Sequence, residues 1–104
     1  MDQEPIIVYV DEDLEELIPE FLENRHEDVT AIRNLLVAGD LSEIQRLGHS
    51  MKGSGGGYGF FELTDIGSEI EEAAKNGNIN IIDEKVEDLE DYLANLKIVY
   101  KEMD

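Results

Sequence analysis

The sequence predicts an all-α fold, an up-down antiparallel four-helix bundle with a short extra N-terminal helix. Three observations support this fold class. Apolar residues recur at three- and four-residue spacing in four segments, as they do on the buried face of an amphipathic helix. The connections between those segments are short, which makes successive helices antiparallel neighbours. The 104 residues, 41% of them hydrophobic, suffice for one domain with a modest core.

The N-terminal segment has the composition of a strand. Residues 5–10, Pro-Ile-Ile-Val-Tyr-Val, are mostly β-branched and apolar. No second strand is apparent elsewhere in the sequence to pair with them. We therefore expect residues 1–11 to form an extended arm and residues 12–104 to form the bundle domain.

A proline divides the first helical region into two parts. Aspartates and glutamates near residue 12 favour a short helix over residues 12–18, where Pro19 interrupts it. Proline is tolerated in a first helical turn, so a long helix is expected from Pro19 to Ala38, ended by Gly39-Asp40. Its apolar stripe consists of Phe21, Leu22, Val29, Ile32, Leu35 and Leu36.

Three further helices follow. The second begins near Leu41, and residues 57–60 turn the chain. The third is expected over residues 61–75, ended by Asn-Gly-Asn at 76–78. The fourth is expected over residues 81–101 because apolar residues alternate four and three apart, as in a bundle seam. That seam consists of Ile82, Val86, Leu89, Leu93, Leu96 and Tyr100.

Composition excludes several classes of function. The net charge of −18 argues against nucleic acid and anionic membrane surfaces as partners, because like charges repel. The absence of cysteine excludes disulfides and thiolate metal sites. No apolar run approaches the roughly 20 residues of a membrane span, and no signal peptide is visible. We therefore expect a soluble, cytoplasmic protein.

The second helix carries an unusual combination of residues. Steps of about 100° per residue from Ile44 place four residues on its apolar face: Leu47, Gly48, Met51 and Gly55. His49 falls about 140° from Ile44, on the solvent side. Beside it lie Lys52, Gly53 and Gly56.

The glycines need a reason, because each costs roughly 1 kcal/mol relative to alanine inside a helix. Gly48 and Gly55, on the apolar face, allow a neighbouring helix to approach closely. Gly53 and Gly56 leave room for another macromolecule to reach the imidazole, which is a good nucleophile when neutral and exposed. The nearby ammonium could stabilise an anion formed there, since unit charges about 4 Å apart attract by about 4 kcal/mol at an effective dielectric near 20.

The segment His49-Ser50-Met51-Lys52-Gly53-Ser54 with Tyr58-Gly59 resembles the His-x-x-Lys-Gly-Ser/Ala…Gly signature of histidine-containing phosphotransfer (HPt) domains. The resemblance extends from about Leu14 to the C-terminus. It implies a four-helix bundle in which His49 is the phosphoacceptor and Lys52 stabilises the phosphoryl group. We expect three residues to contact the partner: Gln45, Gly53 and Gly56.

The resemblance also implies the role and the partners. The chain would be a phosphorelay intermediate without kinase activity, taking a phosphoryl group from one receiver-domain aspartate and passing it to another. Its partners would be response-regulator receiver domains and a hybrid or sensor histidine kinase. We expect no cofactor in this chain, since the receiver would supply Mg²⁺. Two alternatives stay open, namely the phosphoacceptor module of a chemotaxis-type kinase and an adaptor bundle that binds receivers without transfer.

Other chemical signals have simpler explanations. A P-loop needs a lysine after its glycines, whereas Lys52 precedes the glycine run. The many carboxylates fall outside the apolar stripes, which predicts a solvated surface rather than a metal site. His26 lies in the polar stretch Arg-His-Glu-Asp and is expected to be a solvated histidine.

Overall fold

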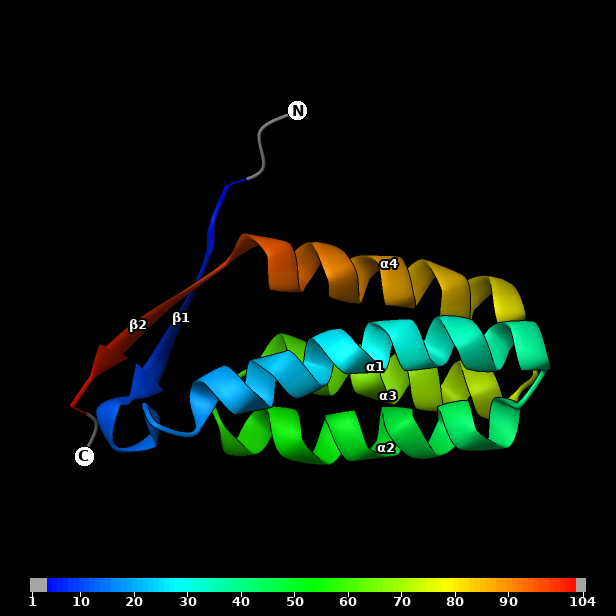
Figure 1. Cartoon of the computed structure of the whole chain (residues 1–104), viewed down its shortest axis with the longest axis horizontal. Coiled ribbons are helices and arrows are strands. Elements are labelled where there is room, and N and C mark those ends of the chain that lie inside the picture. The colour runs from blue at the N-terminus through cyan, green and yellow to red at the C-terminus, as the bar shows by residue number, and fades with distance from the viewer. Residues whose placement is uncertain (1–3, 103–104) are drawn as a thin grey trace.

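The computed structural model describes residues 4–102. Within that range four helices lie side by side, and two strands pair at one end of the bundle (Figure 1). The elements in chain order are β1 (Ile6–Asp11), the 3₁₀ turn η1 (Glu12–Leu14), α1 (Ile18–Ala38), α2 (Leu41–Gly57), α3 (Phe61–Lys75), α4 (Ile79–Asn95) and β2 (Leu96–Lys101). The predicted four-helix architecture is confirmed for this part of the chain.

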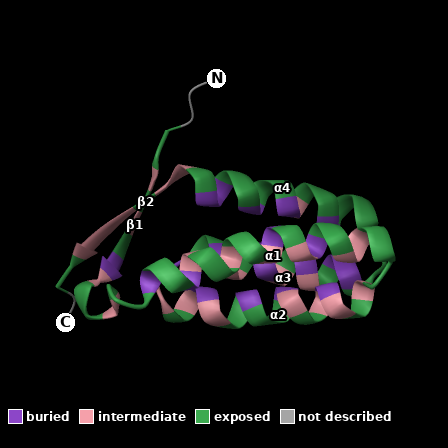
Figure 2. Cartoon of the chain, viewed as in Figure 1, coloured by how far each residue is buried: buried purple, intermediate pink, exposed green. Residues whose placement is uncertain are grey.

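The core lies between the inner faces of the helices (Figure 2). Each helix contributes side chains that are fully buried, and the predicted apolar stripes supply most of them. The largest fully buried side chains include Ile32 of α1, Ile44 of α2, Ile70 of α3 and Leu89 of α4. The hydrophobic faces that the periodicity predicted are therefore the faces that pack together.

Helices α2 and α3 touch through their backbones. A Cβ atom on Gly48 would lie 2.7 Å from the backbone nitrogen of Glu71, and one on Gly67 would lie 2.6 Å from that of Lys52. A Cβ on Gly55 would lie 2.9 Å from Leu63 Cβ. Any larger residue at these positions would push the two helices apart. The predicted role of Gly48 and Gly55 in close helix approach is confirmed.

The expected short N-terminal helix over residues 12–18 is wrong. Only Glu12–Leu14 form a 3₁₀ turn, before which the side chain of Asp11 accepts a hydrogen bond from the backbone N–H of Asp13 at 2.9 Å. Residues 15–17 form a further turn, and Ile18 already belongs to α1. A helix this short gains few hydrogen bonds for the entropy it loses on nucleation. Pro19 does not end a helix but occupies the first turn of α1. A backbone N–H at that position would have no partner within the helix, so its absence in proline costs nothing there.

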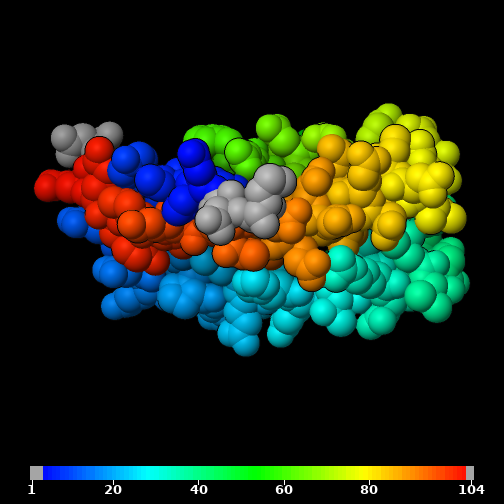
Figure 3. Space-filling view, turned by 90° about the horizontal axis from the view of Figure 1, so that it is seen from above, coloured from blue at the N-terminus to red at the C-terminus, as the bar shows by residue number. Residues whose placement is uncertain are grey.

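The expected fourth helix is too long at its C-terminal end. It ends at Asn95, and the next six residues form β2, which pairs in parallel with β1 from Ile6↔Leu96 to Asp11↔Lys101. The expected unpaired arm is therefore a paired strand, although residues 1–3 of that arm lie outside the described residues. Figure 3 shows the blue β1 and the red β2 side by side.

The strand is preferred over the helix because its inner face completes the core. Val10 is buried, and alternate residues of both strands pack against the core: Ile6, Val8, Leu96, Ile98 and Tyr100. An isolated pair of parallel strands would gain little by itself, so packing against the helices stabilises it. Within the described range no helix has the length and apolar character needed to cross a bilayer.

Gly67→Ala is expected to destabilise the protein by about 1–3 kcal/mol, because the new methyl group overlaps the backbone of α2. Thermal unfolding followed by circular dichroism should show a Tm at least about 5 °C lower. Gly53→Ala is the matched control, since a Cβ there meets nothing within 4 Å. Equal melting of the two variants would contradict the packing argument.

Burial raises the pKa of Tyr92 to about 12, with a smaller contribution from the charge of Glu62. The pKa of Tyr92 in the folded protein thus exceeds the value of about 10 expected in the unfolded chain. Neutral Tyr92 therefore contributes its full stabilisation of the folded protein below about pH 10, and this contribution is lost as pH rises toward about 12. An alkaline titration followed by tyrosinate absorbance should show a late step. That step should be missing in Tyr92→Phe, and its persistence there would rule out the assignment.

Candidate functional site

His49 lies in the middle of α2 and points into solvent. Its side chain is 72% exposed, although the preceding residue, Gly48, is buried against α3. The predicted position of the histidine on the solvent side of the helix is confirmed. The imidazole is therefore accessible to another molecule.

Glu71 of α3 holds one nitrogen of this imidazole. Its Oε2 atom lies 2.8 Å from His49 Nδ1. A carboxylate can only accept a hydrogen bond, so the Nδ1 atom carries the proton and donates it to Glu71. In the neutral ring the lone pair is then on Nε2, and the tautomer is fixed by the neighbouring helix.

Lys52 shares the same carboxylate. Its Nζ atom lies 3.6 Å from Glu71 Oε1, and its side chain is 47% exposed. The backbone carbonyl of Lys52 also accepts a hydrogen bond of 3.1 Å from the Thr64 hydroxyl of α3. One glutamate of α3 thus contacts both the histidine and the lysine of α2.

Sequence reasoning did not single out Glu71 from the other acidic residues of α3. A usable signal was present in the glycines. Gly48 and Gly67 mark where α2 and α3 can touch, and Glu71 follows Gly67 by one helical turn. Because the helices touch at Gly48 and Gly67, the residue one turn after Gly67 lies beside His49, which directly follows Gly48.

The three expected partner-contact residues differ in their exposure and in what surrounds them. Gly53 is exposed, and a Cβ atom there would meet nothing within 4 Å, so bare backbone faces solvent. Gly56 is half-buried, and a Cβ there would lie 3.3 Å from Thr64 Oγ1, so this glycine faces α3. Gln45 is half-buried and lines a shallow hollow together with His49.

The hollow beside His49 has a volume of about 440 Å³. It extends from the imidazole toward the N-terminal end of α2. Its lining is polar and charged, and consists of Ser42, Glu43, Gln45, Arg46, His49 and Glu71. The site is thus an open polar surface rather than an enclosed pocket.

Ser54, the last residue of the sequence motif, has a structural contact. Its hydroxyl oxygen accepts a hydrogen bond of 2.8 Å from Arg25 Nη1, which links α2 to α1. His26 is exposed on α1, as expected of a solvated histidine. No group of three or more histidine, aspartate or glutamate side chains between residues 4 and 102 is arranged to hold a metal ion.

Comparison with protein families gives one result that covers most of the chain. The model of the Hpt domain family matches residues 16–98. Comparisons with curated proteins and with solved structures gave no significant match. The chain therefore belongs to the Hpt domain family, whose members are histidine phosphotransfer modules of phosphorelays.

Proposed function

We propose that this chain is a phosphorelay intermediate in which His49 accepts a phosphoryl group from a receiver-domain aspartate and passes it to another. The observation that carries the proposal is the exposed imidazole with Nδ1 bound to Glu71 at 2.8 Å. This contact leaves Nε2 as the nucleophilic atom. The family membership supports phosphotransfer in general, and the geometry supports His49 as the residue that performs it.

In the transfer step, the Nε2 lone pair attacks the phosphorus of the aspartyl phosphate. The P–N bond forms as the P–O bond to the aspartate breaks, and the aspartate carboxylate leaves with the bonding electrons. The ring becomes positively charged while the proton stays on Nδ1. The Glu71 carboxylate would stabilise that charge through its hydrogen bond, which then has a cationic donor as well as an anionic acceptor.

Lys52 would offset charge on the phosphoryl oxygens. Its ammonium is only loosely held, at 3.6 Å from Glu71 Oε1, and its side chain is half exposed. A small movement would bring it from the carboxylate to a phosphoryl group on the neighbouring ring. Because such a cation acts where charge is redistributed, it favours the transfer in both directions.

The partner would supply the rest of the chemistry. A receiver domain would hold Mg²⁺ and the acidic residues around its own aspartate, while a hybrid or sensor histidine kinase would provide the phosphoryl group upstream. The bare backbone at Gly53 would let the receiver approach the imidazole without displacing a side chain. The chain itself would act as a carrier without kinase activity.

His49→Gln is expected to abolish transfer, because glutamine offers no nucleophilic nitrogen. The chain would be incubated with a receiver phosphorylated with labelled phosphate, and acid-labile label would be followed. His26→Gln is the matched control, since it removes the other exposed histidine and should transfer as the wild type does. Label that persists on His49→Gln would refute the proposal, and receiver binding without any transfer would favour the adaptor alternative.

Glu71→Gln is expected to slow the transfer about 10-fold, because a neutral amide replaces a charge-assisted hydrogen bond with a weaker one. Nitrogen NMR of the imidazole should show the proton on Nδ1 in the wild type. The same measurement should show a mixture of the two tautomers in Glu71→Ala. Glu69→Gln is the control, since Glu69 lies on the same helix but pairs with Lys85 at 2.8 Å. Unchanged rate and tautomer in both Glu71 variants would remove this residue from the mechanism.

A further inference from the structure

Two basic residues of α2 flank the histidine symmetrically. Arg46 lies three residues before His49, and Lys52 lies three residues after it. On a helix, residues three apart are neighbours on the surface, with Cβ atoms about 5–6 Å apart. Arg46 is 64% exposed and lines the hollow that also contains the imidazole and Glu71. The expectations from sequence gave this arginine no role.

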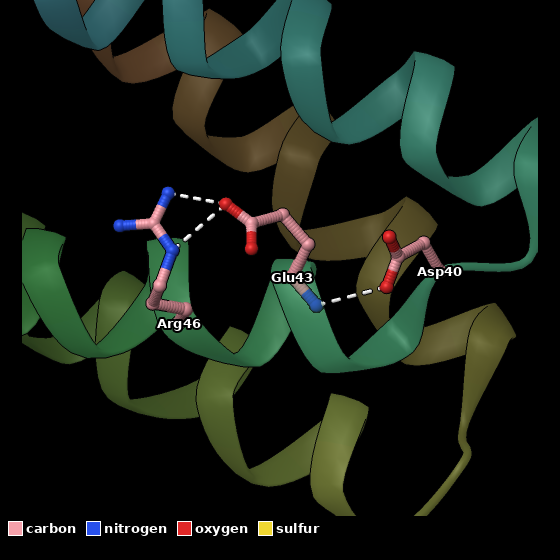
Figure 4. Close-up of polar contacts among 3 residues, drawn as sticks. All are labelled: Asp40, Glu43 and Arg46. Carbon is pink, nitrogen blue, oxygen red and sulfur yellow. Dashed lines mark hydrogen bonds and ion pairs between the residues drawn. The ribbon is translucent and has the colours of Figure 1, made fainter.

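Arg46 is bound by Glu43, which lies three residues before it on α2. Its Nε atom donates a hydrogen bond of 2.8 Å to Glu43 Oε1, and its Nη2 atom donates to the same oxygen (Figure 4). The backbone N–H of Glu43 is in turn fixed by the Asp40 cap at 3.1 Å. A salt bridge between two exposed side chains of one helix contributes little to stability. A more highly charged anion, such as a phosphoryl group, can therefore replace Glu43 as the partner of Arg46.

Two ion pairs lie near His49 before phosphorylation. Arg46 and Lys52 contribute two positive charges, and Glu43 and Glu71 contribute two negative ones. A phosphoryl group adds a charge of about −1.5 to −2, in a chain whose net charge is already −18. The positive charge of the ring offsets part of this addition but is paired with Glu71, and Lys52 shares that same carboxylate.

Arg46 is better placed than the other two arginines to supply the missing charge. Arg25 is bound to Ser54 at 2.8 Å and is nearly buried between α1 and α2. Arg33 is bound to Glu90 of α4 at 3.0 Å, and so is occupied between α1 and α4. Arg46 by contrast lies on the phosphoacceptor helix, at the edge of the hollow.

We propose that Arg46 is a second phosphoryl-binding residue, which leaves Glu43 and binds the phosphoryl oxygens once His49 is phosphorylated. This inference rests on the proposed function of His49. The planar guanidinium can donate two parallel hydrogen bonds to two phosphoryl oxygens, a geometry that the ammonium of Lys52 does not offer. Glu43 then acts as a competitor that keeps the arginine in place while the histidine is unmodified.

The test uses the whole chain loaded with phosphoramidate, a small phosphodonor that requires no docked partner. The second pKa of the phosphoryl group would be followed by phosphorus NMR. A nearby cation favours the dianion and lowers this pKa, so Arg46→Gln should raise it by about half a unit. Glu43→Gln should lower it, because the arginine is released toward the phosphoryl group. Loading should be about three-fold slower in Arg46→Gln, by the same loss of charge stabilisation.

The matched control is Arg33→Gln, which removes another exposed arginine and its ion pair with Glu90 of α4. Arg33 does not line the hollow beside His49. Its phosphoryl pKa and loading rate should equal those of the wild type. Arg46→Gln values equal to those of Arg33→Gln would overturn the role of Arg46 while leaving His49 as phosphoacceptor. A wild-type chain that takes up no phosphoryl group would instead overturn the proposed function and, with it, this inference.

Discussion

The backbone contact between α2 and α3 is the constraint on which the rest of the site depends. Gly48 and Gly67 have no room for a methyl group, because each faces backbone atoms of the other helix. Two helices this close have a fixed register, since a shift by one residue would place a side chain in the contact. That register decides which acidic residue of α3 lies beside the histidine.

The chemical consequence is a division of tasks between the two helices. α2 supplies the exposed imidazole and the cations, whereas α3 supplies Glu71, which orients the ring and holds the lysine. Glu71 is better shielded than either of its partners, with 21% of its side chain exposed. A carboxylate positioned by a rigid neighbouring helix is better suited to fix a tautomer than one on a mobile surface loop.

Much of the fold could be predicted from sequence because it follows from local patterns. The bounds of α3 and the exposed position of His49 depend only on helical periodicity and on the residues that end helices. The end of α4 could not be predicted in this way, because Leu96 and Tyr100 continue the helical stripe and also suit a strand. The partner strand that decides between them comes from the opposite end of the sequence. Glu71 was missed for a similar reason, since its importance depends on the register of two helices and not on its own neighbours.

The parallel pairing of β1 with β2 has a mechanical consequence. The chain enters β1 at Ile6 and leaves β2 at Lys101, and these residues are at opposite ends of the six-residue ribbon. Tension applied to the two ends of the chain would therefore load all the hydrogen bonds of the ribbon together, in shear, rather than peel them apart one by one. The two strands would thus resist a pulling force before the helices, including the one that carries His49, are disturbed.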